Sequence, residues 1–354
     1  MKTCLRRASG MLAILFLAAV AATAADHEHD LLVLTSTNNP SGNEVIVFKL
    51  NRGGTPSLSF VNALPTGGDG GASGNAGILQ FRDDLGAVGN FGSNTVTQLV
   101  RNDDLISVGR TVKLAAGCTN PDSVALTHEH LFVVGNNCAE SHNWPGGDLD
   151  GKVVQLSDSS AGQIAIGKTW GAVTLKSGSI LRLPLTEDGA LNGSSLSVTL
   201  PSAANNTPLG AAFWGNILGF TPAHSPDSFA IVDENGNVFP VVGPTPPYPS
   251  NAPCWVAKGR GNVWYAGNSP GQAISIFFSD GQGGVFYKSV PLPGVATDVT
   301  VSRDARWLAV IYTAADGSGG RIAVFAIDDY GDLSLAATSS PIGVAGFNGV
   351  AISQ

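Results

Sequence analysis

The stretch that decides the fold is DVTVSRDARWLAVIYTAADGSGGRIAVFAIDDYGDLSLAATS, Asp298–Ser339. It holds four apolar runs, DVTVS, WLAVIY, RIAVFAI and LSLAATS, separated by the turn RDAR, the loop TAADGSGG and the turn DDYGD. Short runs rich in β-branched and aromatic residues, bounded by Gly, Asp and Ser, are typical of antiparallel strands. The stretch therefore predicts a sheet of four consecutive antiparallel strands.

The same four-run pattern recurs along the chain. The second strand of each unit is expected to begin near Leu31, Leu85, Leu131, Val173, Ile217, Val263 and Trp307. A four-stranded unit repeating every 40–50 residues is typical of a β-propeller blade. The sequence thus predicts an all-β fold, a seven-bladed β-propeller of four-stranded antiparallel blades.

One segment, Gly151–Leu175, is hard to divide. It holds either the outer half of blade three and the inner half of blade four, or a long excursion in a six-bladed ring; we favour seven blades. At the termini, LLVLTST (Leu31–Thr37) resembles a second strand without a first, and Gly349–Gln354 a first strand without a second. We expect the C-terminal strand to join blade one and close the ring, leaving no open sheet edge.

The first 25 residues have the features of a secretory signal peptide, namely a basic start, an apolar run and small residues before Asp26. The apolar run is shorter than a membrane span needs. We therefore expect a signal peptide over 1–25 and a single propeller domain over 26–354, secreted and without a membrane span. Removing Lys2, Arg6 and Arg7 would shift the net charge from −8 to −11, which disfavours nucleic acid as a partner.

Secretion permits disulfides and glycosylation. Cys118 and Cys138 flank two apolar runs joined by Thr-His-Glu-His, so in a hairpin they face each other, and we predict that they form a disulfide. Cys254 is expected to be a buried, inert thiol. Asn192 and Asn205 begin glycosylation sequons that apply if the host is eukaryotic.

The repeat resembles a known family. The strand–turn–strand AVGNFGSNTV (Ala87–Val96) is similar to that of the lactonase-type seven-bladed propellers, which include 6-phosphogluconolactonase and carboxymuconate cyclase. TSTNNPSGNEVIVFKL, TGGDGGASGNAGILQF and GNFGSNTV, in this order, are similar to a secreted branch of that family. The resemblance implies a polar site of His, Arg and Glu around the central channel and ring opening or closure of a lactone.

The family's catalytic motifs have no counterpart here. Its proline-histidine-any-histidine pattern before an inner strand is replaced by sequences such as NPDSV and APCWV, and its asparagine–arginine pair by GNFGSN and GNSPGQ. Two hypotheses follow: a lactonase-like or cyclase-like protein that binds or turns over a small lactone, hydroxy acid or sugar-like ligand, or a non-catalytic extracellular binding protein such as an adhesin. A structural cell-wall component is a third hypothesis.

The candidate site residues come from loops expected on one face of the ring, where the links before first strands and between second and third strands meet. We predict His224 as general base, Arg321 as partner of a substrate carboxylate and Asp298 as a channel carboxylate. The predicted ligand-binding residues are Asn90, Asn94, Asp122, Asn137, His142, Trp144 and Asn268.

Each of these residues also has a purely structural interpretation. The Gly-Asn pairs are turn residues that tolerate left-handed backbone angles. The loop Glu140–Lys152 holds His142 and Trp144 and is expected on the same face, where it would bind a sugar or Ca²⁺, although its D-x-D-G lacks the ligands of a complete calcium loop. The turn Thr127–His130 is expected on the opposite face, solvated. We expect no metal or other cofactor, a small-molecule or carbohydrate ligand, and a monomer.

Overall fold

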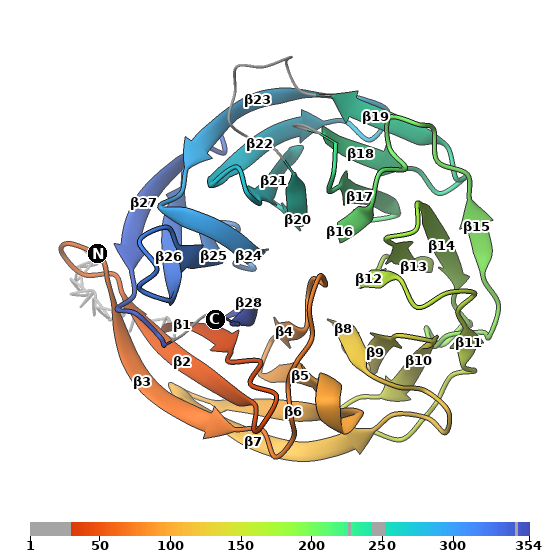
Figure 1. Cartoon of the computed structure of the whole chain (residues 1–354), viewed down its shortest axis with the longest axis horizontal. Helices are drawn as coiled ribbons and strands as arrows, with labels where there is room; N and C mark the ends of the chain where they lie inside the picture. Colours follow the sequence, from red (N-terminus) through yellow and green to blue (C-terminus); the bar gives the residue numbers. More distant parts are fainter. Residues whose placement is uncertain (1–29, 226–227, 243–251, 344–345) are drawn as a thin grey trace, which may run out of the picture.

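The computed structural model describes residues 30–225, 228–242, 252–343 and 346–354. These form seven four-stranded antiparallel sheets arranged in a ring around a central channel (Figure 1). The predicted signal peptide, Asp227 and the segment 243–251 lie outside the described residues. Across the described residues, no helix has the length and apolar character needed to cross a membrane.

The blades follow the predicted repeat, and seven is the correct number. From the inner to the outer strand, blade one is β28 (Asn348–Ser353), β1 (Leu31–Ser36), β2 (Glu44–Asn51) and β3 (Ser57–Pro65), and blade two is β4 (Leu79–Arg82), β5 (Leu85–Asn90), β6 (Thr95–Asn102) and β7 (Leu105–Lys113). Blade three is β8 (Pro121–Leu126), β9 (His130–Gly135), β10 (Cys138–Asn143) and β11 (Val154–Gln155). Blade four is β12 (Ala161–Ile166), β13 (Trp170–Leu175), β14 (Ser179–Pro184) and β15 (Leu196–Val198). Blade five is β16 (Pro208–Trp214), β17 (Ile217–Pro222), β18 (Ser228–Val232) and β19 (Val238–Val242); blade six is β20 (Pro253–Lys258), β21 (Val263–Asn268), β22 (Ala273–Ser279) and β23 (Gly284–Pro291); blade seven is β24 (Gly294–Val301), β25 (Trp307–Ala314), β26 (Gly320–Ile327) and β27 (Leu333–Thr338).

The C-terminal strand closes the ring as predicted. β28 pairs antiparallel with β1, with Leu34 opposite Ala351 and Leu32 opposite Ser353. Blade one is therefore built from both ends of the described chain, with β28 beside β4 and β24 at the channel (Figure 1). The ambiguous segment resolves in favour of seven blades, because β11 completes blade three, and β12 and β13 begin blade four.

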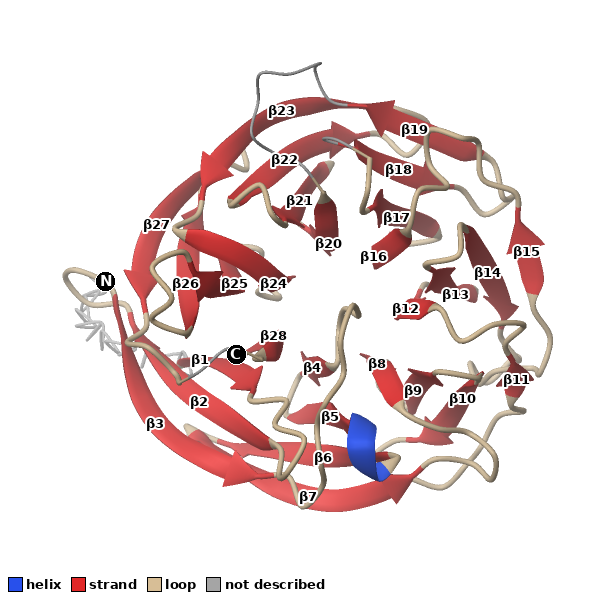
Figure 2. Cartoon of the chain, viewed as in Figure 1, coloured by secondary structure: helices blue, strands red, loops and turns tan. Residues whose placement is uncertain are grey.

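The core lies between the blades. The second and third strands are buried along most of their length, and large side chains such as Trp264, Tyr265 and Tyr312 fill the spaces between neighbouring sheets. The outer strands are more exposed and carry scattered apolar side chains, including Phe60 on β3 and Leu335 on β27. Apart from strands, the described residues contain one short helical turn, η1 (Phe91–Ser93), shown in Figure 2.

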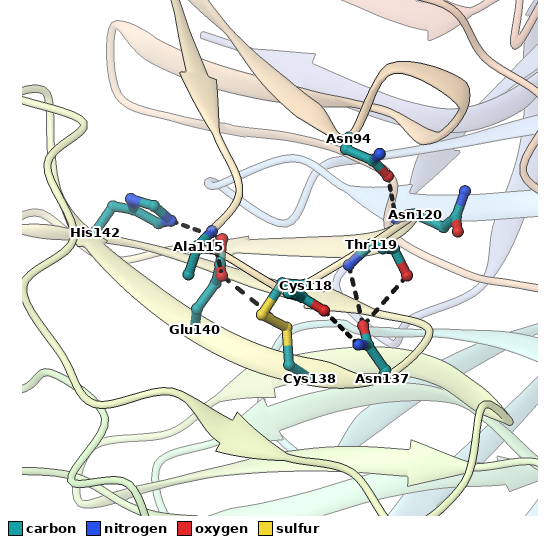
Figure 3. Close-up of a disulfide and its surroundings, with 10 residues drawn as sticks. Asn94, Ala115, Cys118, Thr119, Asn120, Asn137, Cys138, Glu140 and His142 are labelled. Atoms are coloured by element: carbon teal, nitrogen blue, oxygen red, sulfur yellow. Dashed lines mark hydrogen bonds and ion pairs between the residues drawn. A yellow bond between two sulfur atoms is a disulfide. The ribbon is translucent and has the colours of Figure 1, made fainter.

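The predicted disulfide is present, but it joins different elements from those expected. Cys118 lies in the link between blades two and three, and Cys138 begins β10, the third strand of its blade. Their Cα atoms are 5.6 Å apart. The Glu140 carboxylate lies beside the bridge and accepts a hydrogen bond from the Ala115 amide at 2.9 Å, as Figure 3 shows. The bridge thus connects the link between blades two and three to strand β10, rather than joining two paired strands of a hairpin.

Candidate functional site at the mouth of the channel

The position of the insertion between β3 and β4 is the main feature that sequence analysis did not predict. Residues 66–78, here called the tongue, leave the outer strand of blade one and reach the centre of the ring before entering blade two (Figure 1). The run of glycines lets the tongue pack closely. A Cβ at Gly70 would lie 2.3 Å from the backbone carbon of Asn38, so any larger residue there would displace the chain.

Hydrogen bonds hold the tongue across the channel. The Gly77 amide donates to the Asp298 carboxylate of blade seven at 3.2 Å, and Gly77 O accepts from the Val124 amide of blade three at 2.9 Å. The Ala76 amide donates to Gly162 O of blade four at 3.1 Å. The tongue is therefore bonded to several inner strands at once.

Asn75 is the most deeply anchored residue of the tongue, with 1% of its surface exposed. Its side-chain amide donates to Asp122 O, its Oδ1 accepts from Asn348, and its backbone O accepts from Trp255 Nε1 at 3.0 Å. These partners come from blades three, one and six. Asn75 thus lies at the centre of the ring, and its hydrogen bonds fix the shape of the mouth.

A cavity of about 530 Å³ lies against the tongue at the mouth of the channel. This volume is in the range of small-molecule sites. The cavity is on the predicted face, between the links that precede first strands and those that join second to third strands. Its lining is formed by Asn38, Ala72, Ser73, Gly74, Asn75, Lys176, Thr207, Leu209, Ala223, His224, Cys254, Trp255, Thr297, Thr313, Gly346, Phe347 and Asn348.

His224 is the one predicted catalytic residue that the structure brings to this cavity. It follows β17 in an exposed turn, and its Nδ1 atom lies 2.8 Å from Thr207 Oγ1. Thr207 has a φ of 61°, which is rare for a β-branched residue, and strained backbone of this kind clusters at functional sites. Among the described residues, the His224 Nε2 atom has no hydrogen-bond partner.

Lys176 is a second polar residue of the cavity, and sequence analysis did not single it out. It follows β13, the second strand of blade four, and its ammonium donates to Gly74 O of the tongue at 2.8 Å. Lys176 lies in the link between the second and third strands of its blade, and His224 lies in the corresponding link of the next blade. That equivalence of position is the sequence signal that would have identified it.

Asp298 lies deeper in the channel, below the tongue. It lines a second cavity of about 240 Å³ along the inner strands, toward the opposite face. Burial raises the pKa of the Asp298 carboxyl to about 7, although amides of Val299, Gly77 and Val350 oppose the shift by hydrogen bonding to it. Burial likewise raises the pKa of Asp122 to about 7, opposed by the charge of Lys176.

Arg321 is not among the described residues that line the mouth cavity. It lies on β26 of blade seven, where its guanidinium donates to Ser318 Oγ at 3.2 and 3.4 Å. The three residues predicted as catalytic, His224, Asp298 and Arg321, are thus in three different places: the cavity, the channel below the tongue, and the start of strand β26.

The predicted ligand-binding asparagines hold turns and strand ends together instead of lining the cavity. Asn90 is fully buried, and its side-chain amide makes four hydrogen bonds, accepting from Asn43 and Thr66 and donating to Thr95 and Thr97. This exhausts the hydrogen-bonding capacity of an asparagine amide. Asn90 therefore has no group left for a ligand.

The other turn asparagines have similar structural partners. Asn94, with a left-handed φ of 55°, accepts from the Asn120 amide at 2.7 Å. Asn137 accepts from the Thr119 amide at 3.0 Å and fixes the loop that carries Cys118. Asn268 is fully buried at the end of β21 and donates to Ser275 at 2.9 Å. These contacts agree with the interpretation of the Gly-Asn pairs as structural turn residues.

The loop that follows β10 lies on the opposite face from the cavity, so its expected placement was wrong. Glu140–Asn143 belong to β10 itself, and the rest of the loop joins the third and fourth strands of blade three. His142 is buried, with Nε2 2.9 Å from Glu140 Oε1 and Nδ1 3.1 Å from Gly147 O. Trp144 is also buried and packs in the core. Neither side chain faces the mouth cavity.

The turn Thr127–His130 is on the opposite face, as predicted, but His130 is not solvated. Its ring nitrogens lie 2.7 Å from Asp150 Oδ2 and 2.7 Å from Asp188 O. Burial lowers the pKa of His130, but its bonds to Asp188 and Asp150 more than offset this, so the pKa is raised overall. His130 therefore ties together the loops of blades three and four on that face.

Cys254, the cysteine outside the bridge, borders the mouth cavity and is partly rather than fully buried. Burial raises the pKa of its thiol to about 12, opposed by a contact with Ser269, and the thiol donates to Ala252 O at 3.3 Å. A thiol with so high a pKa is a poor nucleophile. The expectation of an unreactive cysteine fits these properties.

The two glycosylation sequons begin at accessible positions. Asn205 is exposed in the link before β16, and Asn192 is half-buried in the loop before β15. The Asn192 Oδ1 atom accepts from Ser194. Glycosylation at either position remains a prediction.

Comparison with known proteins gives matches among solved structures alone. No protein-family model and no curated protein sequence matches the chain. A protein from Lactobacillus plantarum is 16% identical, with a TM-score of 0.65, over 92% of this chain and 99% of its own. The periplasmic gluconolactonase of Pseudomonas aeruginosa is 15% identical, with a TM-score of 0.64, over 92% and 99% of the two chains.

A virginiamycin B lyase from Staphylococcus aureus is similar over 80% of this chain and 96% of its own, with 14% identity and a TM-score of 0.55. Identities this low carry information on the fold and not on the site. Together with the seven closed blades, they show that this chain has the seven-bladed propeller fold found in the gluconolactonase structure.

Proposed function

We propose that this protein is a secreted, lactonase-like propeller that binds a small lactone at the mouth cavity and hydrolyses it to the hydroxy acid. The observation that carries the proposal is the His224–Thr207 pair, which stands in a cavity of ligand size and leaves one imidazole nitrogen available. The fold shared with a gluconolactonase supports the choice of lactones by analogy.

The proposed reaction uses residues of the cavity alone. When the Thr207 hydroxyl accepts the proton of His224 Nδ1, Nε2 is the basic nitrogen and can remove a proton from water. The water oxygen then attacks the lactone carbonyl, and the Lys176 ammonium stabilises the oxyanion that forms. Cleavage of the ring C–O bond returns the proton from His224 to the departing alkoxide, giving one hydroxy acid per lactone and water consumed.

In this proposal Lys176 takes the role of positive partner that the sequence suggested for Arg321, because Lys176 lines the cavity. Histidine is the side chain that most often serves as a general base in enzymes. Thr207 is a positioning residue, since it acts through the imidazole.

Replacing His224 by alanine should lower kcat/KM for lactone hydrolysis by about 100-fold, the usual contribution of a general base. Thr207→Val should cost less, since it removes only the hydrogen bond at Nδ1 that orients the imidazole. Hydrolysis of a lactone panel, followed by titration of the released acid, measures both. The matched control is His128→Ala, which alters an exposed histidine on the opposite face.

A binding protein without turnover is the second candidate. It is favoured by the small number of ionisable groups in the cavity, whose described lining has His224, Lys176 and the unreactive Cys254. Saturable lactone binding by the wild type without acid release would decide for this candidate. Equal hydrolysis rates for the wild type and His224→Ala would contradict the proposed base.

A further inference from the structure

We infer that the mouth cavity selects an apolar or aromatic lactone over a sugar lactone. The inference rests on the proposed function, because it takes the mouth cavity as the ligand site. It specifies the class of ligand from the hydrogen bonds that the lining residues have already made.

The side chains that shape the cavity are largely apolar. Trp255 and Phe347, each 8% exposed, form part of the lining together with Leu209, Ala72 and Ala223. They come from blades five and six, from the tongue and from the link before β28. Such a lining gains free energy by covering aliphatic or aromatic ligand surface.

Several polar side chains of the lining are occupied by one another and by the backbone. Asn38 accepts from the amides of Gly71 and Ala72 through Oδ1, and donates to Ala72 O and Gly346 O through Nδ2. Its capacity of two acceptor and two donor positions is thereby exhausted. Asn38 braces the tongue and offers nothing to a ligand hydroxyl.

Three further polar side chains are engaged. The Trp255 indole nitrogen donates to Asn75 O, and the Thr297 hydroxyl donates to Ile311 O at 3.3 Å. The Asn75 amide is held by Asp122 and Asn348. The remaining Asn348 Oδ1 atom has no partner among the described residues, but protein atoms cover it.

This leaves four polar side chains of the described lining with positions for a ligand: His224 through Nε2, Lys176 through the N–H groups that do not bind Gly74, and Ser73 and Thr313 through their hydroxyl groups. They suit the carbonyl and ring oxygens that every lactone has. A sugar lactone carries several further hydroxyl groups, and each one buried without a partner weakens binding by about tenfold. Selection against sugars thus follows because few polar side chains of the lining remain free to bond these hydroxyl groups.

The test compares two δ-lactones, dihydrocoumarin, which is aromatic and has no hydroxyl group, and δ-gluconolactone. Their dissociation constants are measured by calorimetry on the full mature chain carrying His224→Ala, which suppresses turnover, and hydrolysis of each is measured with the wild type. We expect dihydrocoumarin to bind at least tenfold more tightly. Equal affinity, tighter binding of δ-gluconolactone, or no binding of either would overturn the inference.

The two readouts separate the inference from the proposed reaction. Preferential binding of dihydrocoumarin without hydrolysis by the wild type supports the inference and contradicts the reaction. Hydrolysis of δ-gluconolactone with weaker binding of dihydrocoumarin supports the reaction and contradicts the inference.

A matched pair of variants in blade seven locates the binding site. Thr313 lies on β25 at the mouth cavity, whereas Thr300 lies on β24 and lines the two cavities toward the opposite face; both are half-buried. Thr313→Arg should weaken dihydrocoumarin binding at least tenfold, and Thr300→Arg should leave it unchanged. The reverse pattern would place the ligand elsewhere and contradict the inference.

Discussion

The free energy of unfolding is expected to fall by about 2 to 3 kcal/mol between pH 5 and pH 8 through Asp298 alone. Burial raises the pKa of this carboxyl from 3.8 to about 7, so the folded chain holds a proton that the unfolded chain has lost. Stability from a raised pKa is fully present below 3.8 and is lost as the pH rises through about 7. Each unit of difference between the pKa values of the folded and unfolded states corresponds to about 1.4 kcal/mol.

Thermal unfolding at pH 5 and pH 8 measures the effect, which corresponds to about 4 °C for a chain of this size. In Asp298→Asn the group cannot ionise, so the difference between the two pH values should shrink by this amount. Asp329→Asn, at an exposed carboxylate of the same blade, is the control and should keep the wild-type difference. If Asp298→Asn and the control show the same pH dependence, Asp298 is not buried in the way described.

Ionisation of Asp298 also affects the candidate site, because the Asp298 carboxylate accepts a hydrogen bond from the Gly77 amide at the base of the tongue. Ionisation at high pH charges a group that is covered by protein. Asp122, whose pKa is also raised to about 7, lies next to the Asn75 anchor and contributes with the same sign. Both carboxyls thus link the pH to the support of the tongue.

Loss of the Cys118–Cys138 bridge should destabilise the fold by about 3 kcal/mol. The bridge closes a loop with a sequence separation of 20 residues. Opening such a loop raises the conformational entropy of the unfolded chain, which stabilises the unfolded state by about 3 kcal/mol. The double variant Cys118→Ser, Cys138→Ser should therefore melt about 4 to 5 °C below the wild type.

Cys254→Ser leaves the bridge intact and is the control for changing a cysteine. A reducing agent should lower the melting temperature of the wild type and not that of the double variant. A double variant that melts at the wild-type temperature would show that the link between blades two and three is held by its other contacts, such as the bonds of Asn137 to Thr119.

The sequence predicted the ring well because the blade pattern is local. The second strands begin within one residue of the expected position in six blades, and β13 begins at Trp170, three residues before Val173. The predicted start of β13 was too late because the run before Trp170–Ala172 contains no clear turn signal in the sequence. The pairing of the two cysteines was also predicted correctly. The expected hairpin is formed by β8 and β9, but both cysteines lie just outside it rather than opposite each other within it.

The misplaced loop of blade three has a specific cause. The third strand β10 has the sequence CAESHN, without the alternating apolar residues that mark a strand, so the residues from Glu140 onward were taken for a loop. Each strand crosses the ring from one face to the other, so overlooking β10 reversed the predicted face of the residues that follow it in the blade. His142 and Trp144 were therefore assigned to the wrong face. The His142 imidazole pairs with the buried Glu140 carboxylate, and Trp144 packs in the core.

The tongue was unpredictable for a different reason. Its partners lie far along the chain, as in the bond from Trp255 to Asn75, which spans 180 residues. The glycines that permit its close packing look, in the sequence, like those of any flexible surface loop. The role of Lys176 was missed with it, since Lys176 is brought into the site by its contact with the tongue.

The most direct test of the account is a crystal structure of His224→Ala soaked with dihydrocoumarin. The account predicts that the ring lies in the mouth cavity, against Trp255 and the tongue, with its carbonyl directed at Lys176 and its ester group beside position 224. A ligand found in the cavity below the tongue or on the opposite face, with the mouth cavity empty, would contradict it.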